Sequence, residues 1–377
     1  MASGKIANVL IVGGGLAGMT LATALVRGGI HVDLIELQPR WNVLGVGISV
    51  QGPTLRALKT IGLLDQCIDA GFGYTQVVDC DQEGKVFGIV DLPRLLGPDY
   101  PSCIGMMRPA FHDVLCGAMT AEGVMPRFGL TVDALHDNGD AVDVTFSDGT
   151  RGRYDLVVGA DGAYSKVRTL IFGASPKPEY TGQAVWRAMV PRPSNGAARN
   201  AYYGPRHKAG FNPVSRDEMY VYLVQNVTGD PWLAPEEWPG VMRELLSDFG
   251  GYIGEIRETI TDPARIVYRP VERLLLPSPW HRGRTVLIGD AVHTAPPQLA
   301  SGAAIAIEDA IVLAEMLHLD RPCGEILDGF VARRYERCQL VVENSYRLGE
   351  WEKNPEMPGA DPVGLQSRSF MALAKPI

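Results

Sequence analysis

The chain has 377 residues, of which 46% are hydrophobic and 21% are charged, and its formal net charge is -8 at pH 7. This length and composition are ordinary for a globular protein of two joined domains. An acidic balance without a long basic run excludes a surface built for nucleic acid or for anionic membranes, and no segment is long and apolar enough to span a bilayer.

The six cysteines form no C-x-x-C pair and show no metal-ligand spacing. Six cysteines in so long a chain do not make a disulfide framework. They predict reduced thiols in a cytoplasmic protein, and the sequence offers no metal site.

The first motif is a strand followed by a glycine-rich turn. Val9 to Val12 predict a buried strand, and Gly13, Gly15 and Gly18 follow with the spacing G-x-G-x-x-G that opens a helix. The first glycine permits a tight turn, the second lets a pyrophosphate approach the backbone, and the third lets the helix pack closely on the strand. The phosphates are expected on the free N–H groups of the helix that begins near Leu16.

A second strand, His31 to Ile35, completes this unit. It ends in Glu36, at the position where an acidic side chain accepts hydrogen bonds from an adenosine ribose. Strand, glycines, helix, second strand and acid together predict a dinucleotide-binding unit rather than an ordinary strand–helix turn. This motif leaves open whether the dinucleotide is NAD or FAD.

The next 120 residues carry weaker signals. The apolar segment 43–50 contains Gly45 and Gly47, which indicate either backbone lying against a flat ligand or a strand with a bulge. Residues 77–90 predict a hairpin, and a helix is expected to begin at Arg108-Pro109, with Arg108 contacting a ligand or solvent. Three strands, 131–135, 141–146 and 151–158, follow with Asn-Gly and Asp-Gly turns, which predicts a meander.

Two further motifs place an acid after a buried strand. Asp161-Gly162 follows the strand that ends at Val158, and Gly289-Asp290 follows residues 284–288. Between them, residues 180–276 predict a mostly antiparallel region interrupted by one helix at 238–249. A buried helix over 303–317, a long amphipathic helix over 325–352 and a Pro- and Gly-rich tail are expected at the end.

The glycine-rich turn, the Asp161-Gly162 block and Gly289-Asp290, in this order, resemble the class A FAD-dependent monooxygenases of the p-hydroxybenzoate hydroxylase fold. Salicylate- and 6-hydroxynicotinate-type hydroxylases are the most similar members. The resemblance implies FAD rather than NAD, with Asp290 on the ribityl chain and Arg108 along the ribityl-phosphate stretch. It also implies further cofactor contacts at Leu16, Ala17, Leu37, Gly47, Leu130, Asp161, Gly302 and Ala303.

The fold implied is of the α/β (α+β) class. A Rossmann-like FAD-binding domain with a β-meander is expected over residues 1–75, 101–175 and 281–320. An antiparallel-sheet substrate domain is expected over 76–100 and 176–280, and a C-terminal helix and tail over 321–377.

The activity implied is hydroxylation of a small phenolic or hydroxypyridine-type ring by dioxygen, through a flavin C4a-hydroperoxide, with NADH or NADPH as co-substrate. A monomer or homodimer is expected. Two alternatives stay open: a flavoenzyme of another reaction type, such as a halogenase, isoprenoid reductase or epoxidase, and a redox-inactive flavin-binding protein.

Four residues are candidates for catalytic roles. His207 has the side-chain pKa that suits removal of a hydroxyl proton near neutrality, although a lone histidine in a loop is also commonly just solvated. Ser49 stands where the 6-hydroxynicotinate hydroxylases have a histidine, and Tyr222 lines a pocket or is a half-buried strand residue. Pro297 matches a family proline whose carbonyl faces the substrate, or it makes a rigid turn.

Overall fold

The computed structural model describes residues 6–377, except 44, 175, 193–198, 205 and 230–231. The contacts within the chain divide it into two compact units. Unit 1 comprises residues 1–42, 112–179 and 272–377, and unit 2 comprises residues 43–111 and 180–271. The mixed α/β class expected from the sequence is confirmed. Compared with the expected domains, this division places residues 43–75 and 101–111 in unit 2, and residues 176–179, 272–280 and 321–377 in unit 1.

Unit 1 is built on a six-stranded sheet of order β18-β19-β12-β1-β2-β8. Its strands are β1 (Asn8–Val12), β2 (His31–Glu36), β8 (Arg127–Phe128), β12 (Leu156–Gly159), β18 (His281–Arg282) and β19 (Thr285–Leu287). All neighbours are parallel except β18 and β19. The four residues of β12 are all buried, as expected for a parallel strand that is covered on both faces.

The helices of unit 1 connect and cover these strands. They are α1 (Leu16–Arg27), α5 (Lys166–Phe172), α8 (Gly302–Leu317), α9 (Cys323–Lys353) and α10 (Pro362–Ala374), with most of α4 (Arg108–Ala121). Helix α8 packs against α1 and α9, and nearly all of its residues are buried, which confirms that it is an internal helix. None of the described helices combines the length and the apolarity that crossing a membrane requires.

The meander differs from the expectation in its third strand. It consists of β9 (Val132–Asp137), β10 (Val142–Phe146) and β11 (Arg151–Tyr154), whereas β12 belongs to the parallel sheet. The predicted strand 151–158 is therefore wrong as one element. The break lies at Asp155, whose carboxylate accepts the backbone N–H groups of Ala7 and Asn8 at 2.8 and 2.9 Å and so ties the chain to the start of β1.

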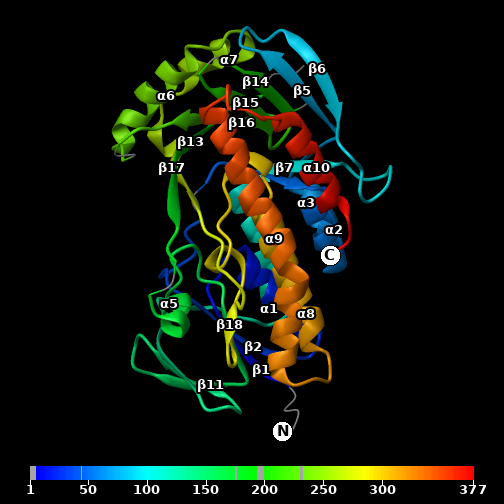
Figure 1. Cartoon of the computed structure of the whole chain (residues 1–377), viewed down its shortest axis with the longest axis vertical. Helices are drawn as coiled ribbons and strands as arrows, with labels where there is room; N and C mark the ends of the chain where they lie inside the picture. The colour runs from blue at the N-terminus through cyan, green and yellow to red at the C-terminus, as the bar shows by residue number, and fades with distance from the viewer. Residues whose placement is uncertain (1–5, 44, 175, 193–198, 205, 230–231) are drawn as a thin grey trace. The chain divides into compact units, whose positions relative to one another are not determined.

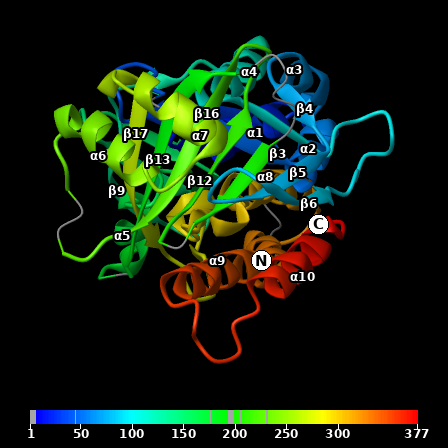
Figure 2. The ribbon, with the colours of Figure 1, turned by 90° about the horizontal axis from the view of Figure 1, so that it is seen from above.

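The C-terminal tail is also not irregular. Residues 362–374 form α10, which lies beside α9 (Figures 1 and 2) and buries Leu365 and Leu373. Asp361 caps this helix by accepting the N–H of Gly364, and Pro362 occupies the first turn. The sequence interpretation gave weight to the glycines and prolines of the tail and so missed the helix start at Asp361-Pro362, an N-cap aspartate followed by a first-turn proline.

Unit 2 contains a seven-stranded sheet of order β17-β13-β16-β15-β14-β5-β6. These strands are β5 (Gln76–Asp81), β6 (Val86–Asp91), β13 (Glu179–Pro191), β14 (Arg199–Tyr203), β15 (Lys208–Pro213), β16 (Glu218–Asn226) and β17 (Ile266–Arg273). A smaller sheet has the order β3-β7-β4, formed by β3 (Gly47–Gln51), β4 (Phe72–Tyr74) and β7 (Cys103–Met107). Two short helices, α2 (Gly52–Thr60) and α3 (Leu64–Asp69), join β3 to β4.

Two helices, rather than the one expected, cover the seven-stranded sheet. They are α6 (Trp238–Leu246) and α7 (Gly251–Ile256), and both lie against the face formed by β13 and β16 (Figure 2). The predicted helix 238–249 is wrong at its C-terminal end because the chain turns at 247–250 before α7 starts. Met242, Leu246, Ile253 and Ile256 pack there with Trp186 in one apolar core.

Candidate functional site

The glycine-rich turn of unit 1 has two glycines that the fold requires and one that faces open space. Gly13 has φ +109°, and a Cβ there would lie 2.4 Å from the carbonyl oxygen of Ala160. A Cβ on Gly18 would lie 2.0 Å from the carbonyl oxygen of Gly13. In contrast, no heavy atom lies within 4 Å of the Cβ position of Gly15, and no side chain caps α1, which begins at Leu16. An open, uncapped helix N-terminus fits the phosphates of a dinucleotide.

Glu36 is held at the end of β2 by this turn. Its Oε2 accepts the N–H of Gly14 at 2.8 Å, and its Oε1 accepts the N–H of Gln38 at 2.9 Å. Because a carboxylate has about four lone-pair positions, both oxygens retain capacity to accept ribose hydroxyls.

Trp41 is a neighbour of the turn that sequence reasoning missed. A Cβ on Gly14 would lie 2.5 Å from the indole ring of Trp41, which packs edge-on against His112 and Phe128. The signal for it was Gly14, the middle glycine of the run 13–15, which the G-x-G-x-x-G spacing does not require.

Asp161 is engaged by its own chain. Its carboxylate accepts Ser165 Oγ at 2.5 Å and the N–H groups of Lys166 and Val167 at 2.8 and 3.0 Å. Burial raises the pKa of Asp161, and these hydrogen bonds act in the opposite direction. The side chain therefore fixes the turn before α5, whose N-terminus it caps.

The loop 289–293, which carries the Gly289-Asp290 motif, is held from two directions. From α8, Asp309 Oδ2 accepts the N–H of Gly289 at 3.0 Å and lies 2.6 Å from His293 Nε2. From α5, the buried Arg168 donates to the carbonyl oxygens of Ala291 and Ala163, both at 2.8 Å. Arg168 thus ties the loop after Asp161 to the loop after Gly289.

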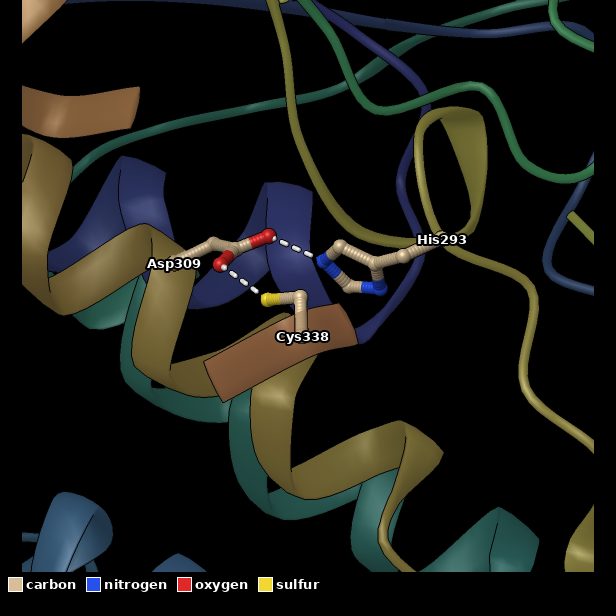
Figure 3. Close-up of side chains that lie close together, drawn as sticks. All are labelled: His293, Asp309 and Cys338. Atoms are coloured by element: carbon tan, nitrogen blue, oxygen red, sulfur yellow. Dashed lines mark hydrogen bonds and ion pairs between the residues drawn. The ribbon is translucent and has the colours of Figure 1, made fainter. Parts of the chain in front are cut away.

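Asp309 belongs to a fully buried cluster with His293 and Cys338 (Figure 3). Their potential ligand atoms lie within 4.8 Å of one another, which is a spacing that a metal could use. However, Asp309 Oδ1 accepts Arg334 Nε at 2.8 Å while Oδ2 is engaged by His293, so a guanidinium already neutralises the carboxylate. We therefore interpret the cluster as an ion-pair network.

The pKa shifts in this network agree with paired charges. Burial alone would lower the pKa of His293, but Cys338 and Asp309 raise it well above its usual value. Burial would raise the pKa of Asp309, but His293 and Arg334 lower it to about 2. At neutral pH the histidine is therefore a cation and the aspartate an anion.

The remaining cofactor candidates of unit 1 have varied surroundings. The side chain of Asp290 is exposed in the short helical turn Gly289–Ala291, and Gly302 and Ala303 begin α8, which no side chain caps. Leu37 is 60% exposed, whereas Ala17 and Leu130 are buried. Pro297, a catalytic candidate, begins a 3-10 turn in which its carbonyl oxygen accepts the N–H of Ala300 at 2.9 Å.

In unit 2, the two glycines of the segment 43–50 lie against protein atoms. A Cβ on Gly45 would lie 3.0 Å from the side chain of Arg108, whose backbone N–H donates to Val46. A Cβ on Gly47 would lie 2.0 Å from the ring of Tyr220. Close packing of β3 on Tyr220 therefore accounts for the glycine at position 47.

Ser49 lies in a chain of buried polar side chains. Its Oγ is 3.4 Å from the hydroxyl oxygens of both Tyr74 and Tyr220. Cys103 Sγ lies 3.0 Å from the Tyr74 hydroxyl, and Asn212 Nδ2 donates to the Tyr220 hydroxyl at 2.7 Å. Sequence reasoning missed Tyr74, Cys103 and Asn212, because β3, β4, β7 and β15 come together only in the folded unit.

The other two catalytic candidates lie on or beside the large sheet of unit 2. Tyr222 is on β16, and its hydroxyl is buried without a hydrogen bond to any described residue. His207 precedes β15, and its charged neighbours are Arg206 and Asp248. Burial, and then Arg206, lower the pKa of His207, so its imidazole is neutral at pH 7.

Comparison with known proteins identifies the class that this fold and glycine-rich turn define. The family described as FAD binding domain matches residues 6–345. The chain is 32% identical to 2-heptyl-3-hydroxy-4(1H)-quinolone synthase of Pseudomonas aeruginosa over 92% of this chain and 90% of that protein. It is 30% identical to 6-hydroxynicotinate 3-monooxygenase of Bordetella bronchiseptica, over 82% of each.

The fold is similar to that of Klebsiella pneumoniae HpxO, solved with FAD and uric acid. The TM-score is 0.84 at 21% identity, covering 98% of this chain and 92% of HpxO. The chain therefore belongs to the FAD-dependent monooxygenases that share this FAD binding domain.

The open space at Gly15 gives a first test of the cofactor site. We expect Gly15→Ala to weaken FAD binding about tenfold or more, because the added methyl group would stand where a phosphate must approach the backbone. The charged hydrogen bonds that the phosphate would then lose are worth about 1.5–3 kcal/mol. Gly117→Ala in α4 is the matched control, since its Cβ position is also empty. Titration of the apoprotein with FAD measures both; equal affinities for Gly15→Ala and wild type would contradict a phosphate at this turn.

Proposed function

We propose that this monooxygenase hydroxylates a small aromatic or heteroaromatic ring of the phenolic or hydroxypyridine type, with NADH or NADPH as electron donor and dioxygen as co-substrate. The names of two relatives support this, since one acts on 6-hydroxynicotinate and the other is a synthase of a 3-hydroxy-4-quinolone, and both compounds are hydroxylated heteroaromatic rings. FAD, when bound, supplies the redox and oxygen-transfer chemistry. Gly15, Glu36 and Asp290 of unit 1 are proposed to hold it.

The observation that carries the substrate side of this proposal is the chain of buried hydroxyl groups at Ser49. Tyr74 and Tyr220 are 5% and 4% exposed, yet they present hydroxyls around a serine rather than packing as purely apolar residues. Burial raises the pKa of Tyr74 well above its usual value, so it remains a neutral hydrogen-bond donor. Such a group can orient a ring hydroxyl or ring nitrogen by donating and accepting hydrogen bonds.

His207 is the proposed base for a ring hydroxyl. It is half-buried and neutral at pH 7, and its buried Nδ1 accepts no hydrogen bond from a described residue. A neutral imidazole can accept the proton whose removal makes the ring electron-rich. The proton would go to a ring nitrogen of His207 before release to solvent.

The nicotinamide cofactor is proposed to dock only transiently. Among the described residues, one parallel sheet carries a G-x-G-x-x-G turn, and FAD is assigned to that turn. NAD(P)H must then reach the flavin from elsewhere, and substrate binding would control when flavin reduction happens.

Stimulated NAD(P)H oxidation tests this proposal. We expect purified FAD-loaded protein to oxidise NADH or NADPH slowly when it is alone and at least about tenfold faster with a hydroxylated aromatic substrate. The reason is that substrate binding is proposed to control when NAD(P)H reduces the flavin. A panel of phenols, hydroxybenzoates, hydroxypyridines and hydroxyquinolines would be scored by absorbance at the nicotinamide band. Flavin reduction in a stopped-flow instrument that is equally fast with and without every compound would contradict the proposal.

A further inference from the structure

The two edge strands of the seven-stranded sheet differ in how they are protected. At one edge, β17 carries a proline and three charged residues, which are Pro270, Arg269, Glu272 and Arg273. Prolines and charges are devices by which natural proteins keep an edge strand from pairing with another chain. At the other edge, β6 lies outermost beside β5 (Figure 1) and has neither a proline nor a charge in residues 86–90.

The side chains of β6 are apolar and exposed on both faces of the sheet. Val86, Phe87, Ile89 and Val90 are 51%, 64%, 61% and 49% exposed. Ile89 and Val90 are consecutive in the ladder with β5, so their side chains point to opposite faces. A membrane surface or a docked helix would cover one face only, whereas a neighbouring strand covers side chains on both faces. The occupant that fits this edge is therefore an extended strand.

One β-bulge interrupts the inner side of β6. The register with β5 shifts between Asp79 and Cys80, so that Phe87 is an additional residue in β6. Residues 88–91 lie beyond the bulge and are in regular register with β5. Their outer backbone groups are therefore in line to extend the ladder by one more strand.

The charges at the two ends of β6 indicate which strand fits. Lys85 precedes β6, Asp91 is its last residue, and both are exposed. If two copies pair antiparallel along β6, Lys85 of each copy lies at the same end of the pair as Asp91 of the other, whereas parallel strands would place like charges together. Asp91 Oδ1 accepts Gln76 Nε2 at 2.9 Å, and its second oxygen retains the capacity to accept a lysine. The strand is thus complementary to a second copy of itself.

We infer that this protein forms a two-fold symmetric dimer in which the β6 strands of two copies pair antiparallel and join their seven-stranded sheets into one. This contact covers the unprotected edge of both copies and leaves only the β17 edges, which proline and charge protect, so that the assembly closes as a dimer. One pair of strands buries less area than a standard interface, so a dissociation constant on the order of 10 µM is expected.

Sedimentation velocity of the FAD-loaded protein tests the inference. We expect the wild type to change from monomer to dimer between about 1 and 200 µM, which brackets the expected dissociation constant. Amide hydrogen exchange, measured by mass spectrometry, should slow at residues 86–91 over the same range, because their N–H groups gain partners. A wild type that stays monomeric, including one that sediments with phosphatidylcholine vesicles instead, would overturn the inference. A dimer without slower exchange at residues 86–91 would overturn it as well.

A substitution on the exposed edge then assigns the contact to β6. Ile89→Lys should raise the dissociation constant of the dimer at least about tenfold, because lysine on an edge strand opposes pairing. Met371→Lys in α10 is the matched control, since Met371 is also 61% exposed, and it should dimerise as wild type does. Far-UV circular dichroism checks the fold of both variants. A folded Ile89→Lys variant with the wild-type dissociation constant would overturn the inference.

A charge exchange tests the antiparallel orientation of the two strands. Lys85→Asp and Asp91→Lys should each raise the dissociation constant about 3- to 10-fold in low-salt buffer, because like charges would then lie at each end of the pair. The double variant has opposite charges again and should recover most of the wild-type affinity. A double variant that dimerises more weakly than both single variants would overturn the antiparallel pairing.

Discussion

Replacing Asp309 with asparagine is expected to destabilise the protein by about 3–5 kcal/mol, because it leaves two buried cations without their shared anion. Asp309 is fully buried and accepts Arg334 Nε at 2.8 Å, and it lies 2.6 Å from the protonated His293. The ion pairs of Glu308 with Arg334 and Arg337 remain in this variant. The substitution should therefore remove one anion from the network and leave the other ion pairs in place. Urea unfolding followed by far-UV circular dichroism measures the difference.

Glu315→Gln is the matched control on the same helix. Glu315 pairs with Arg333 at the surface, where the two side chains are 51% and 36% exposed. Exposed pairs contribute about 0–1 kcal/mol, so this variant should unfold almost as wild type does. If Asp309→Asn were no less stable than Glu315→Gln, the cluster could not be the charged network described above. Loss of FAD from the folded Asp309→Asn variant is also expected, because Asp309 holds the N–H of Gly289.

Replacing Asp290 with alanine is expected to weaken FAD binding about 10- to 100-fold while the fold stays intact. The proposed contact is a charged hydrogen bond from a ribityl hydroxyl, which is worth about 1.5–3 kcal/mol. The Asp290 side chain is exposed, and its loop is held by hydrogen bonds with Asp309 and Arg168. Fluorescence titration of apoprotein with FAD gives the affinity, and thermal unfolding of the apoprotein verifies the fold.

Asp140→Ala provides the comparison, because Asp140 is an exposed aspartate in the β9–β10 turn of the same unit. This variant removes an equal charge far from the proposed cofactor contacts in sequence. We expect it to bind FAD as wild type does. If Asp290→Ala bound FAD as tightly as Asp140→Ala does, Asp290 would not contact the cofactor.

The cofactor half of the fold could be predicted from the sequence because its signals are local. The turn at Gly13, Gly15 and Gly18 needs only a strand, three glycines and a helix in succession, and the structure shows β1, α1 and β2 at these positions. The long buried helix α8 could also be predicted, since its sequence is apolar almost all round. Membership of the FAD-dependent monooxygenases, inferred from three ordered motifs, is confirmed by the comparisons.

The other features depend on residues that are distant in sequence. The segment around Gly47 indicated either a flat ligand or a bulged strand, and the close approach of the Tyr220 ring, 173 positions later, could not be predicted from it. The network of Asp309, His293 and Arg334 joins a loop and two helices, and no local pattern distinguishes its aspartate from others on amphipathic helices. The chain of hydroxyls at Ser49 likewise joins residues of two different sheets, Ser49 and Tyr74 in one and Tyr220 in the other, which come together only when the chain folds.

The most direct test of the account is the origin of the oxygen atom in the product. FAD-loaded protein would be incubated with NADH or NADPH and the panel of phenols, hydroxybenzoates, hydroxypyridines and hydroxyquinolines under ¹⁸O-labelled dioxygen in unlabelled water, and the products would be analysed by mass spectrometry. The account predicts that one compound of the panel gains a new ring hydroxyl whose oxygen is ¹⁸O, with NAD(P)H consumed in equal amount. NAD(P)H oxidation that yields only hydrogen peroxide with every ring tested, or a hydroxyl oxygen derived from water, would contradict it.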